Sequence, residues 1–441
     1  MTSESQPATG SMDSASSNIT ESTTAKPAFD TNKYEELVEG SAKILFPKSK
    51  VFYNPVQQYN RDLSSLAIRA FSELLIEEKQ AKKRNKQPKS NRPNKKQIDQ
   101  ATENTTSGTN TTPTTSNTAD ITEEKKNSET TEQLSKASTS TCGTEEQVEE
   151  SSSSPSQEPY LNILEALSAT GLRAIRYGKE IPLAQTVIAN DLSKAAVDAI
   201  QLNVDYNDIA GTVIPNEADA INYMANNKSK FHVVDLDPYG TASPFIDTAL
   251  NAIKDDGLML ITCTDLGVLA GNGYPEKCFA LYGGTNLWGD ATHESALRLV
   301  LNMIANTAAK YKKYIEPQLC LSIDFYVRLF IRVKTSPINV KLLASQTMIT
   351  YNCSGCHATA NQFLGKVTAN PNSKSIQNSK KFGLAKGPPV GPTCSFCGSV
   401  HHLCGPMWGG RIQNPEFIDR VLKLQDEASS DIYKTLPRIK D

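Results

Sequence analysis

Leu161-Asn-Ile-Leu-Glu-Ala-Leu-Ser-Ala-Thr-Gly-Leu-Arg173 begins as a short apolar run and passes through small residues into a helical segment. The same pattern recurs beyond it, and each apolar run is followed by enough chain for one helix. Such alternation is typical of βαβ units, so the sequence predicts an α/β fold with a parallel sheet that helices cover on both faces. The expected strands cover residues 161–167, 186–189, 212–215, 231–234, 258–262 and, near the end of the sheet, 324–334.

The length and composition limit the class of protein. At about 150 residues per domain, 441 residues suggest two or three units. Hydrophobic residues make up only 38% of the chain, below the roughly 45–50% of a globular domain, so part of it lacks the composition to fold. The longest apolar runs are far shorter than the roughly 18 residues of a membrane span, which predicts a soluble protein. With 46 basic and 48 acidic residues, a polyanionic partner must be met by local clusters of charge.

Two segments are too polar to build a core. Residues 1–32 are Ser/Thr-rich and contain no Arg, and we expect them to form a disordered tail rather than a mitochondrial presequence. A second low-complexity stretch covers about 80–157, after an amphipathic helix expected at residues 60–75. We therefore expect an α/β domain over residues 33–335 that this insertion interrupts, followed by a smaller domain over residues 336–441.

Acidic residues end successive strands of the predicted sheet, where a ligand of a parallel sheet binds. Asp191 ends the second strand, and Asp219 closes the third. The first strand leads to Arg173 through small residues that lack the G-x-G-x-x-G spacing of a pyrophosphate cradle. Acids without a phosphate loop suit S-adenosylmethionine, which carries a sulfonium cation, a ribose and an adenine amine. The alternative for each Asp is a helix cap.

The fourth strand ends in Asp235-Leu-Asp-Pro-Tyr-Gly240. Asp235 and Asp237 are expected on the same side of the strand, because side chains alternate with a period of two. A carboxylate followed by Pro and an aromatic residue suits methylation of an exocyclic base amine: Asp237 would accept a hydrogen bond from the amine, and Tyr239 would stack on the base. The alternative is an ordinary Asp-Pro-x-Gly turn.

These motifs together resemble one family, the tRNA (guanine-26, N2)-dimethyltransferases. The resemblance rests on residues 52–55, 60–62, 166–173, 190–191, 219–220, 235–240 and 262–265. It implies a Rossmann-like fold of the class I S-adenosylmethionine-dependent methyltransferases. It also implies catalysis by Asp237 and a guanine held between Phe52 and Tyr239. The implied cofactor contacts are Arg61, Arg173, Asp191, Asp219 and Ala220.

The cysteines indicate a metal site. Cys353-Ser-Gly-Cys356 and Cys394-Ser-Phe-Cys397 are two Cys-x-x-Cys pairs that provide the four thiolates of a structural zinc site. The 37 residues between the pairs exceed the usual spacing of a zinc ribbon. His357, His401, His402 and Cys404 are alternative ligands. A thioredoxin-like redox role is disfavoured, since neither pair opens a helix after a strand.

The motifs predict a methyltransferase of an exocyclic base amine, and the resemblance implies that it adds one or two methyl groups to the 2-amino group of guanine 26 in tRNA. The alternatives are a methyltransferase of another exocyclic amine and a non-catalytic zinc-containing RNA-binding protein. We expect a monomer that binds tRNA and does not associate with a membrane. The resemblance implies a further RNA-binding portion, so the C-terminal domain is expected to be incomplete.

A basic run precedes the acidic part of the insertion, with nine Lys or Arg residues between Lys79 and Lys96. We interpret it as a nuclear localisation signal, with a tRNA contact and a solvated linker as alternatives. The expected location is the nucleus, the cytoplasm or both. Translation from an alternative start codon would allow an additional mitochondrial pool.

Overall fold

The structure is a computed structural model that describes residues 32–48, 53–86, 158–271, 273–375 and 379–440. Most of the predicted tail and residues 87–157 of the predicted insertion lie outside these ranges. The described residues within 1–81 and 157–441 belong to one compact unit. The domain boundary expected at residue 336 stays a prediction.

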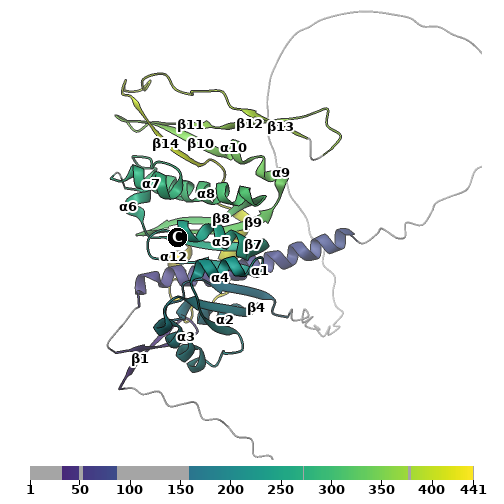
Figure 1. Cartoon of the computed structure of the whole chain (residues 1–441), viewed down its shortest axis with the longest axis vertical. Helices are drawn as coiled ribbons and strands as arrows, with labels where there is room; N and C mark the ends of the chain where they lie inside the picture. Colours follow the sequence, from purple (N-terminus) through teal and green to yellow (C-terminus); the bar gives the residue numbers. More distant parts are fainter. Residues whose placement is uncertain (1–31, 49–52, 87–157, 272, 376–378, 441) are drawn as a thin grey trace, which may run out of the picture. The chain divides into compact units, whose positions relative to one another are not determined.

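A seven-stranded sheet forms the centre of this unit (Figure 1), with the strand order β5-β4-β3-β6-β7-β9-β8. The first five strands in this order are parallel, and β9 is antiparallel to both of its neighbours. The predicted Rossmann-like sheet is confirmed. The strand expected at 324–334 is β9, which runs antiparallel, and the structure adds β8, which the sequence did not predict. The strands are β3 (Leu161–Glu165), β4 (Ala184–Asp191), β5 (Val213–Glu217), β6 (Phe231–Leu236), β7 (Ile253–Cys263), β8 (Lys313–Ile323) and β9 (Tyr326–Thr335).

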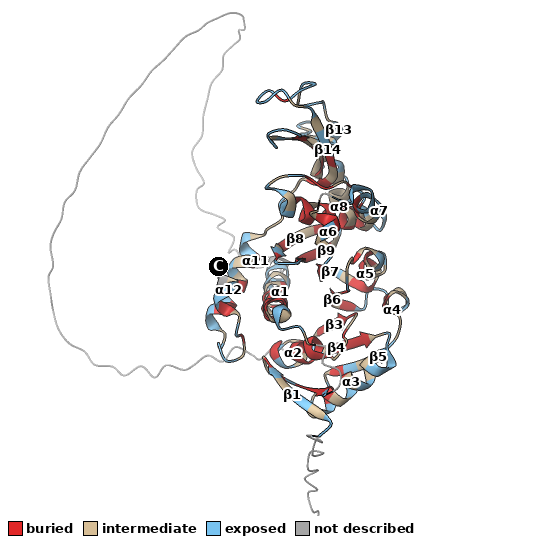
Figure 2. Ribbon diagram, turned by 90° about the vertical axis from the view of Figure 1, so that its left-hand side faces the viewer, coloured by how far each residue is buried: buried red, intermediate tan, exposed pale blue. Residues whose placement is uncertain are grey.

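Both faces of the sheet are buried, as expected for parallel strands whose residues are apolar on both sides. Successive residues of one strand enter opposite cores: Val233 packs on one face and Val234 on the other. The edge-on view shows helices on each side (Figure 2). One face carries α1 (Gln58–Lys86), α2 (Leu172–Glu180), α3 (Lys194–Tyr206), α11 (Pro415–Glu427) and α12 (Leu436–Lys440). The other carries α4 (Ala220–Asn226), α5 (Ile246–Ala252), α6 (Leu266–Leu269), α7 (Pro275–Tyr282) and α8 (Thr292–Lys310).

The predicted amphipathic helix lies within α1. Its buried positions include Leu63, Leu66 and Phe71, which recur at helical spacing and pack against the sheet. A hairpin of β1 (Tyr34–Glu39) and β2 (Ala42–Pro47) precedes α1. The backbone N–H of Leu45 in β2 donates to Oδ1 of Asn203 on α3 at 2.8 Å, which ties the hairpin to the covered sheet.

The cysteine-containing segment forms its own small sheet, with the order β11-β10-β14. Met348, Met407 and Trp408 from this sheet pack into the same core as α8. On α8, Arg298 donates to the carbonyl oxygen of Trp408 at 2.9 Å. The elements of this part are α9 (Pro337–Val340), α10 (Leu343–Gln346), β10 (Thr347–Cys353), β11 (Thr359–Phe363), β12 (Gly365–Ala369), β13 (Lys380–Leu384) and β14 (His401–Trp408). Two 3₁₀ turns, Pro55–Gln57 and Ser243–Phe245, complete the described elements.

The last helices return to the first one. Phe417 and Leu424 of α11 are buried in the core that contains Leu63 of α1. Asp62 of α1 accepts hydrogen bonds from the backbone N–H and the hydroxyl of Thr435, at 3.1 and 2.6 Å. Residues far along the chain therefore hold α1 in place. In the described part of the chain, no helix combines the length and the apolar character needed to cross a membrane.

We expect Phe417→Ala to lower the free energy of unfolding by about 3–5 kcal/mol, because it leaves a cavity in a close-packed core. Phe417 is 1% exposed, whereas Phe382 on β13 is 41% exposed. Phe382→Ala is therefore the matched control and should leave the denaturation midpoint nearly unchanged. Equal midpoints for both variants in a urea titration would contradict the packing of α11 described here.

Candidate active site

A cavity of about 640 Å³ opens beside the carboxyl ends of β3, β4 and β6. Strand β3 lies between β4 and β6, so the chain leaves this point in opposite directions, as at the ligand sites of other open α/β sheets. The start of α1 and the turn between β8 and β9 complete the wall. The lining residues are Tyr53, Asn54, Val56, Gln57, Arg61, Glu165, Leu167, Ser168, Ala169, Thr170, Leu172, Arg173, Asp191, Asp237, Pro238, Tyr239, Thr264, Phe325 and Tyr326.

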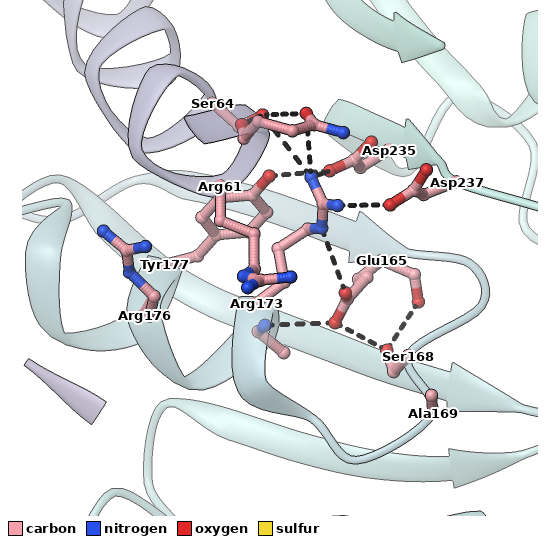
Figure 3. Close-up of polar contacts among 12 residues, drawn as sticks. Arg61, Ser64, Glu165, Ser168, Ala169, Arg173, Arg176, Tyr177, Asp235 and Asp237 are labelled. Carbon is pink, nitrogen blue, oxygen red and sulfur yellow. Dashed lines mark hydrogen bonds and ion pairs between the residues drawn. The ribbon is translucent and has the colours of Figure 1, made fainter. Parts of the chain in front are cut away.

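Arg173, near the start of α2, joins three carboxylates at this cavity (Figure 3). Its Nη2 donates to Oδ2 of Asp237, its Nη1 lies 3.5 Å from Oδ2 of Asp235, and its Nε lies 3.6 Å from Oε1 of Glu165. Burial alone would lower the pKa of Arg173, but Asp237 and Asp235 raise it well above its ordinary value. Arg173 therefore stays charged and fixes the direction of the Asp237 carboxylate.

Asp235 is the buried anion that contacts both Arg173 and Arg328. It is wholly buried, and its Oδ1 accepts from Nη1 of Arg328 at 2.8 Å while its Oδ2 accepts from the hydroxyl of Tyr177 at 2.6 Å. Burial alone would raise the pKa of Asp235, but Arg328 and Arg173 hold it below its ordinary value. Since Asp235 and Asp237 both contact Arg173, they lie on the same side of the strand end, as predicted.

Glu165 shapes the loop after β3. Its Oε2 accepts from the hydroxyl of Ser168 at 2.7 Å and from the backbone N–H of Ala174 at 3.0 Å. Burial raises the pKa of Glu165 to about 8, and Arg173 acts in the opposite direction. These bonds fold the small-residue loop back toward α2, which exposes the loop backbone to the cavity.

Asp191 lines the cavity at the end of β4. Its Oδ2 accepts from the backbone N–H of Ala169 at 2.9 Å, and its Oδ1 accepts from that of Ser193 at 2.9 Å. The carboxylate thus links the loop after β3 to the loop after β4. Each oxygen keeps a second lone pair for a ligand hydroxyl.

Asp219 and Ala220 are placed differently from the other predicted cofactor residues. Oδ1 of Asp219 accepts from the backbone N–H of Asn222 at 2.8 Å, so Asp219 caps α4, which is the alternative that the sequence left open. Ala220 is 5% exposed and packs in the core. Neither is among the described residues that line the cavity.

Arg61 lines the opposite wall, on the first turns of α1. Its Nε donates to Oε1 of Glu39 at 2.6 Å, and its Nη2 donates to the carbonyl oxygen of Asn54 at 3.1 Å. Its guanidinium carbon lies 5.4 Å from the ring centroid of Tyr53. The structure therefore brings together Arg61, Arg173, Asp191, Asp237 and Tyr239 around one cavity.

The predicted turn follows Asp237. The backbone N–H of Gly240 donates to Oγ1 of Thr264 at 2.8 Å, and the N–H of Thr264 donates to the carbonyl oxygen of Gly240 at 2.8 Å. Gly240 has a φ of +77° with open space around it, so backbone conformation, not crowding, requires glycine there. Tyr239 is 81% exposed at the mouth of the cavity. Phe52, predicted as its partner, lies outside the described residues.

The four predicted zinc ligands converge at a second site. All four Sγ atoms of Cys353, Cys356, Cys394 and Cys397 lie within 4.8 Å of one another. The Sγ atoms of Cys353 and Cys397 are 3.3 Å apart, and those of Cys356 and Cys394 are 3.7 Å apart. Zn–S bonds of 2.3 Å in a tetrahedron require about 3.8 Å between sulfurs, so a cluster of this size could hold a zinc ion. Strands β11, β12 and β13 occupy the long spacing between the pairs.

Comparisons with known proteins agree with this geometry. The model of the family described as N2,N2-dimethylguanosine tRNA methyltransferase matches residues 33–441. The chain belongs to this family.

Named relatives extend the likeness. The chain is 48% identical over 421 residues to the mitochondrial tRNA (guanine(26)-N(2))-dimethyltransferase of Saccharomyces cerevisiae, covering 94% of this chain and 67% of the relative. It is 37% identical to the tRNA (guanine(26)-N(2))-dimethyltransferase of Homo sapiens, covering 92% of this chain and 57% of the relative. The chain therefore spans between about half and two thirds of these relatives.

A solved structure has a similar fold to this chain. Trm1 of Pyrococcus horikoshii, in complex with S-adenosyl-L-methionine, is similar with a TM-score of 0.61 and 23% identity. The similarity covers 92% of this chain and 82% of that chain.

Several residues at the site were not predicted from the sequence. Arg328 left a visible signal, because it is a charged residue inside the apolar run of the last predicted strand. Glu165 also left one, as the acid that ends the first strand. Glu39 and Tyr177 gave no signal in the sequence, because their contacts are with Arg61 and Asp235, which lie far from them along the chain.

We expect Asp235→Asn to lower the free energy of unfolding by about 3–5 kcal/mol, because Arg173 and Arg328 would lose a buried anion. Asp198→Asn is the control, since the ion pair of Asp198 with Lys194 has both side chains more than 60% exposed. Urea unfolding of both variants is the measurement. A midpoint for Asp235→Asn as high as that of Asp198→Asn would refute the assigned role.

Proposed function

We propose that this chain transfers methyl groups from S-adenosylmethionine to the 2-amino group of guanine 26 in tRNA. Family membership supports methyl transfer as the reaction, and the names of the relatives support guanine as the base and 26 as its position in tRNA. The observation that carries the proposal is the Asp237 carboxylate, which Arg173 orients at a cavity that Tyr239 borders.

The cavity has the chemistry that the cofactor needs. On the β3–β4 side, Asp191 and the backbone of the adjoining loop suit ribose hydroxyls. Arg61 and Arg173 line the same cavity and suit the carboxylate of the methionine part. When bound, S-adenosylmethionine supplies the electrophilic methyl group. The cofactor contacts of Asp219 and Ala220 stay predictions, since neither residue is among the described residues that line the cavity.

Asp237 then acts on the amine of the base. Arg173 occupies Oδ2, which leaves Oδ1 to accept a hydrogen bond from the 2-amino group. This bond directs the nitrogen lone pair and balances the positive charge that develops during attack. An exocyclic amine needs no strong base beforehand, so a positioned carboxylate suffices and the proton leaves afterwards. The exposed ring of Tyr239 offers a stacking surface to a base turned out of the tRNA.

Cys353, Cys356, Cys394 and Cys397 would hold a structural zinc ion. A four-thiolate site is closed and keeps no position for a substrate. Backbone N–H groups of Gly355 and Cys356 point at the Sγ of Cys353, at 3.4 and 3.5 Å, and would balance thiolate charge. We infer that the ion joins the end of β10 to the loop before β14.

We retain a monomer as the proposed state and tRNA as the proposed partner. The nucleus and the cytoplasm stay the proposed locations, since the basic run after Lys79 supports the former. The Saccharomyces cerevisiae relative is named as a mitochondrial enzyme, which supports an additional mitochondrial pool of this protein.

Methyl transfer to transcripts tests the function. We expect label from S-adenosylmethionine on a tRNA with guanine at position 26 and none on a tRNA with adenine there. Asp237→Ala should lower the rate by about 100-fold or more, because it removes the group that stabilises the developing charge. Asp198→Ala, an exposed Asp outside the cavity, is the matched control.

The outcomes separate the alternatives. Label on the adenine transcript would favour a methyltransferase of another exocyclic amine. RNA binding without transfer, unaffected by Asp237→Ala, would favour a non-catalytic RNA-binding protein.

Zinc content tests the cysteine cluster. We expect about one zinc ion per chain by elemental analysis, and Cys397→Ser should lower both the zinc content and the midpoint of thermal unfolding. Cys278→Ala, a buried cysteine outside the cluster, should keep its zinc. A wild-type content well below one ion per chain would disprove the site.

A further inference from the structure

The turn between β8 and β9 brings two aromatic residues to the cavity. Phe325 lies in this turn and Tyr326 begins β9, and both line the wall. They reach the ligand edge because β9 is antiparallel to β7, with Val327 paired to Cys263 at the carboxyl end of β7. No motif in the sequence pointed to either residue.

Tyr326 carries a polar group without a partner. Its side chain is 2% exposed, and its hydroxyl is buried and makes no hydrogen bond with any described residue. A buried hydroxyl without a partner destabilises the folded protein, and Tyr326 is one of the residues that line the cavity. Burial raises the pKa of Tyr326 to about 12, so at neutral pH the hydroxyl keeps its proton and can donate it in a hydrogen bond.

The position of Tyr326 favours the substrate over the cofactor. The ribose-binding side of the cavity lies at Asp191 on β4, whereas β9 lies on the other side of β6, beyond β7. Tyr326 lines the same cavity as Arg173 and Asp237.

Phe325 extends the same wall outward. Its side chain is 79% exposed at the cavity. The neighbouring Asp324 accepts from Nη2 of Arg438 at 2.8 Å, and the guanidinium carbon of Arg438 lies 4.8 Å from the ring centroid of Tyr59. These contacts to α12 and α1 hold the turn and leave the ring available for stacking.

We propose that this turn binds the substrate nucleotide: the Tyr326 hydroxyl donates a hydrogen bond to an acceptor of the target base, and the Phe325 ring stacks on a tRNA base at the cavity mouth. A hydroxyl donor complements the Asp237 acceptor, since guanine presents both an amine and acceptor atoms. This inference rests on the proposed methyl transfer to tRNA.

Tyr326→Phe is the sharpest test, because it removes only the hydroxyl. We expect kcat/KM for the guanine-26 tRNA to fall about 10- to 100-fold. The dissociation constant of S-adenosylmethionine, measured by calorimetry, should stay within twofold. The thermal midpoint should stay equal or rise, since the buried hydroxyl has no partner to lose. Tyr314→Phe, whose hydroxyl bonds to Glu316 outside the cavity, is the matched control.

Phe325→Ala tests the stacking. We expect the dissociation constant of the same tRNA to rise about 5- to 100-fold, with S-adenosylmethionine binding unchanged. Phe279→Ala, an exposed aromatic residue on α7 outside the cavity, is its control.

Transfer by Tyr326→Phe at the wild-type rate, or a loss of cofactor affinity in that variant, would overturn the role of the hydroxyl. Unchanged tRNA affinity in Phe325→Ala would overturn the stacking. An inactive wild-type protein with intact cofactor binding would instead overturn the proposed function, and this inference with it.

Discussion

Asp235 lies near the end of the central strand β6 as a buried anion between two guanidinium groups. Arg328 reaches it from β9 and Arg173 reaches it from α2, and Tyr177 donates a third contact. A buried charge is tolerated only when it is paired and hydrogen-bonded. The site therefore exists only when β6, β9 and α2 are assembled together, and Arg173 can then present Asp237 to the cavity.

The same kind of pairing fixes α1, which provides one wall of the cavity. Arg176 of α2 contacts Glu39 at 2.9 Å and Asp62 at 2.6 Å, so one guanidinium joins the β1–β2 hairpin to α1. On the outer side, Arg420 of α11 contacts Glu73 at 2.9 Å. The cavity wall at the start of α1 is thus supported by the C-terminal helices, which pack against α1 without lining the cavity themselves.

The reversed strand β9 carries both a residue that pairs with the buried Asp235 and a residue of the proposed substrate site. Its interior carries Arg328, which neutralises Asp235, and its first residue is Tyr326, whose hydroxyl has no described partner. One strand therefore carries a guanidinium group whose Nη1 and Nη2 atoms have described partners and a hydroxyl that has none. Arg328 pairs with Asp235, which in turn contacts Arg173, the residue that orients the proposed catalytic carboxylate of Asp237.

The sequence by itself determined the α/β class, six of the seven strands of the central sheet, the two cysteine pairs and the position of Asp237, because these depend on local periodicity and on the spacing of neighbouring residues. It did not predict β8. It left open whether Asp219 caps a helix, and the tertiary structure shows that it caps α4, while its cofactor contact stays a prediction. Only the tertiary structure decided that Arg328 pairs with Asp235, 93 residues away, and that Phe325 and Tyr326 reach the cavity. The physical reason is that ion pairs and cavity walls form between strands that are adjacent in space and distant along the chain, and local patterns carry no record of that adjacency.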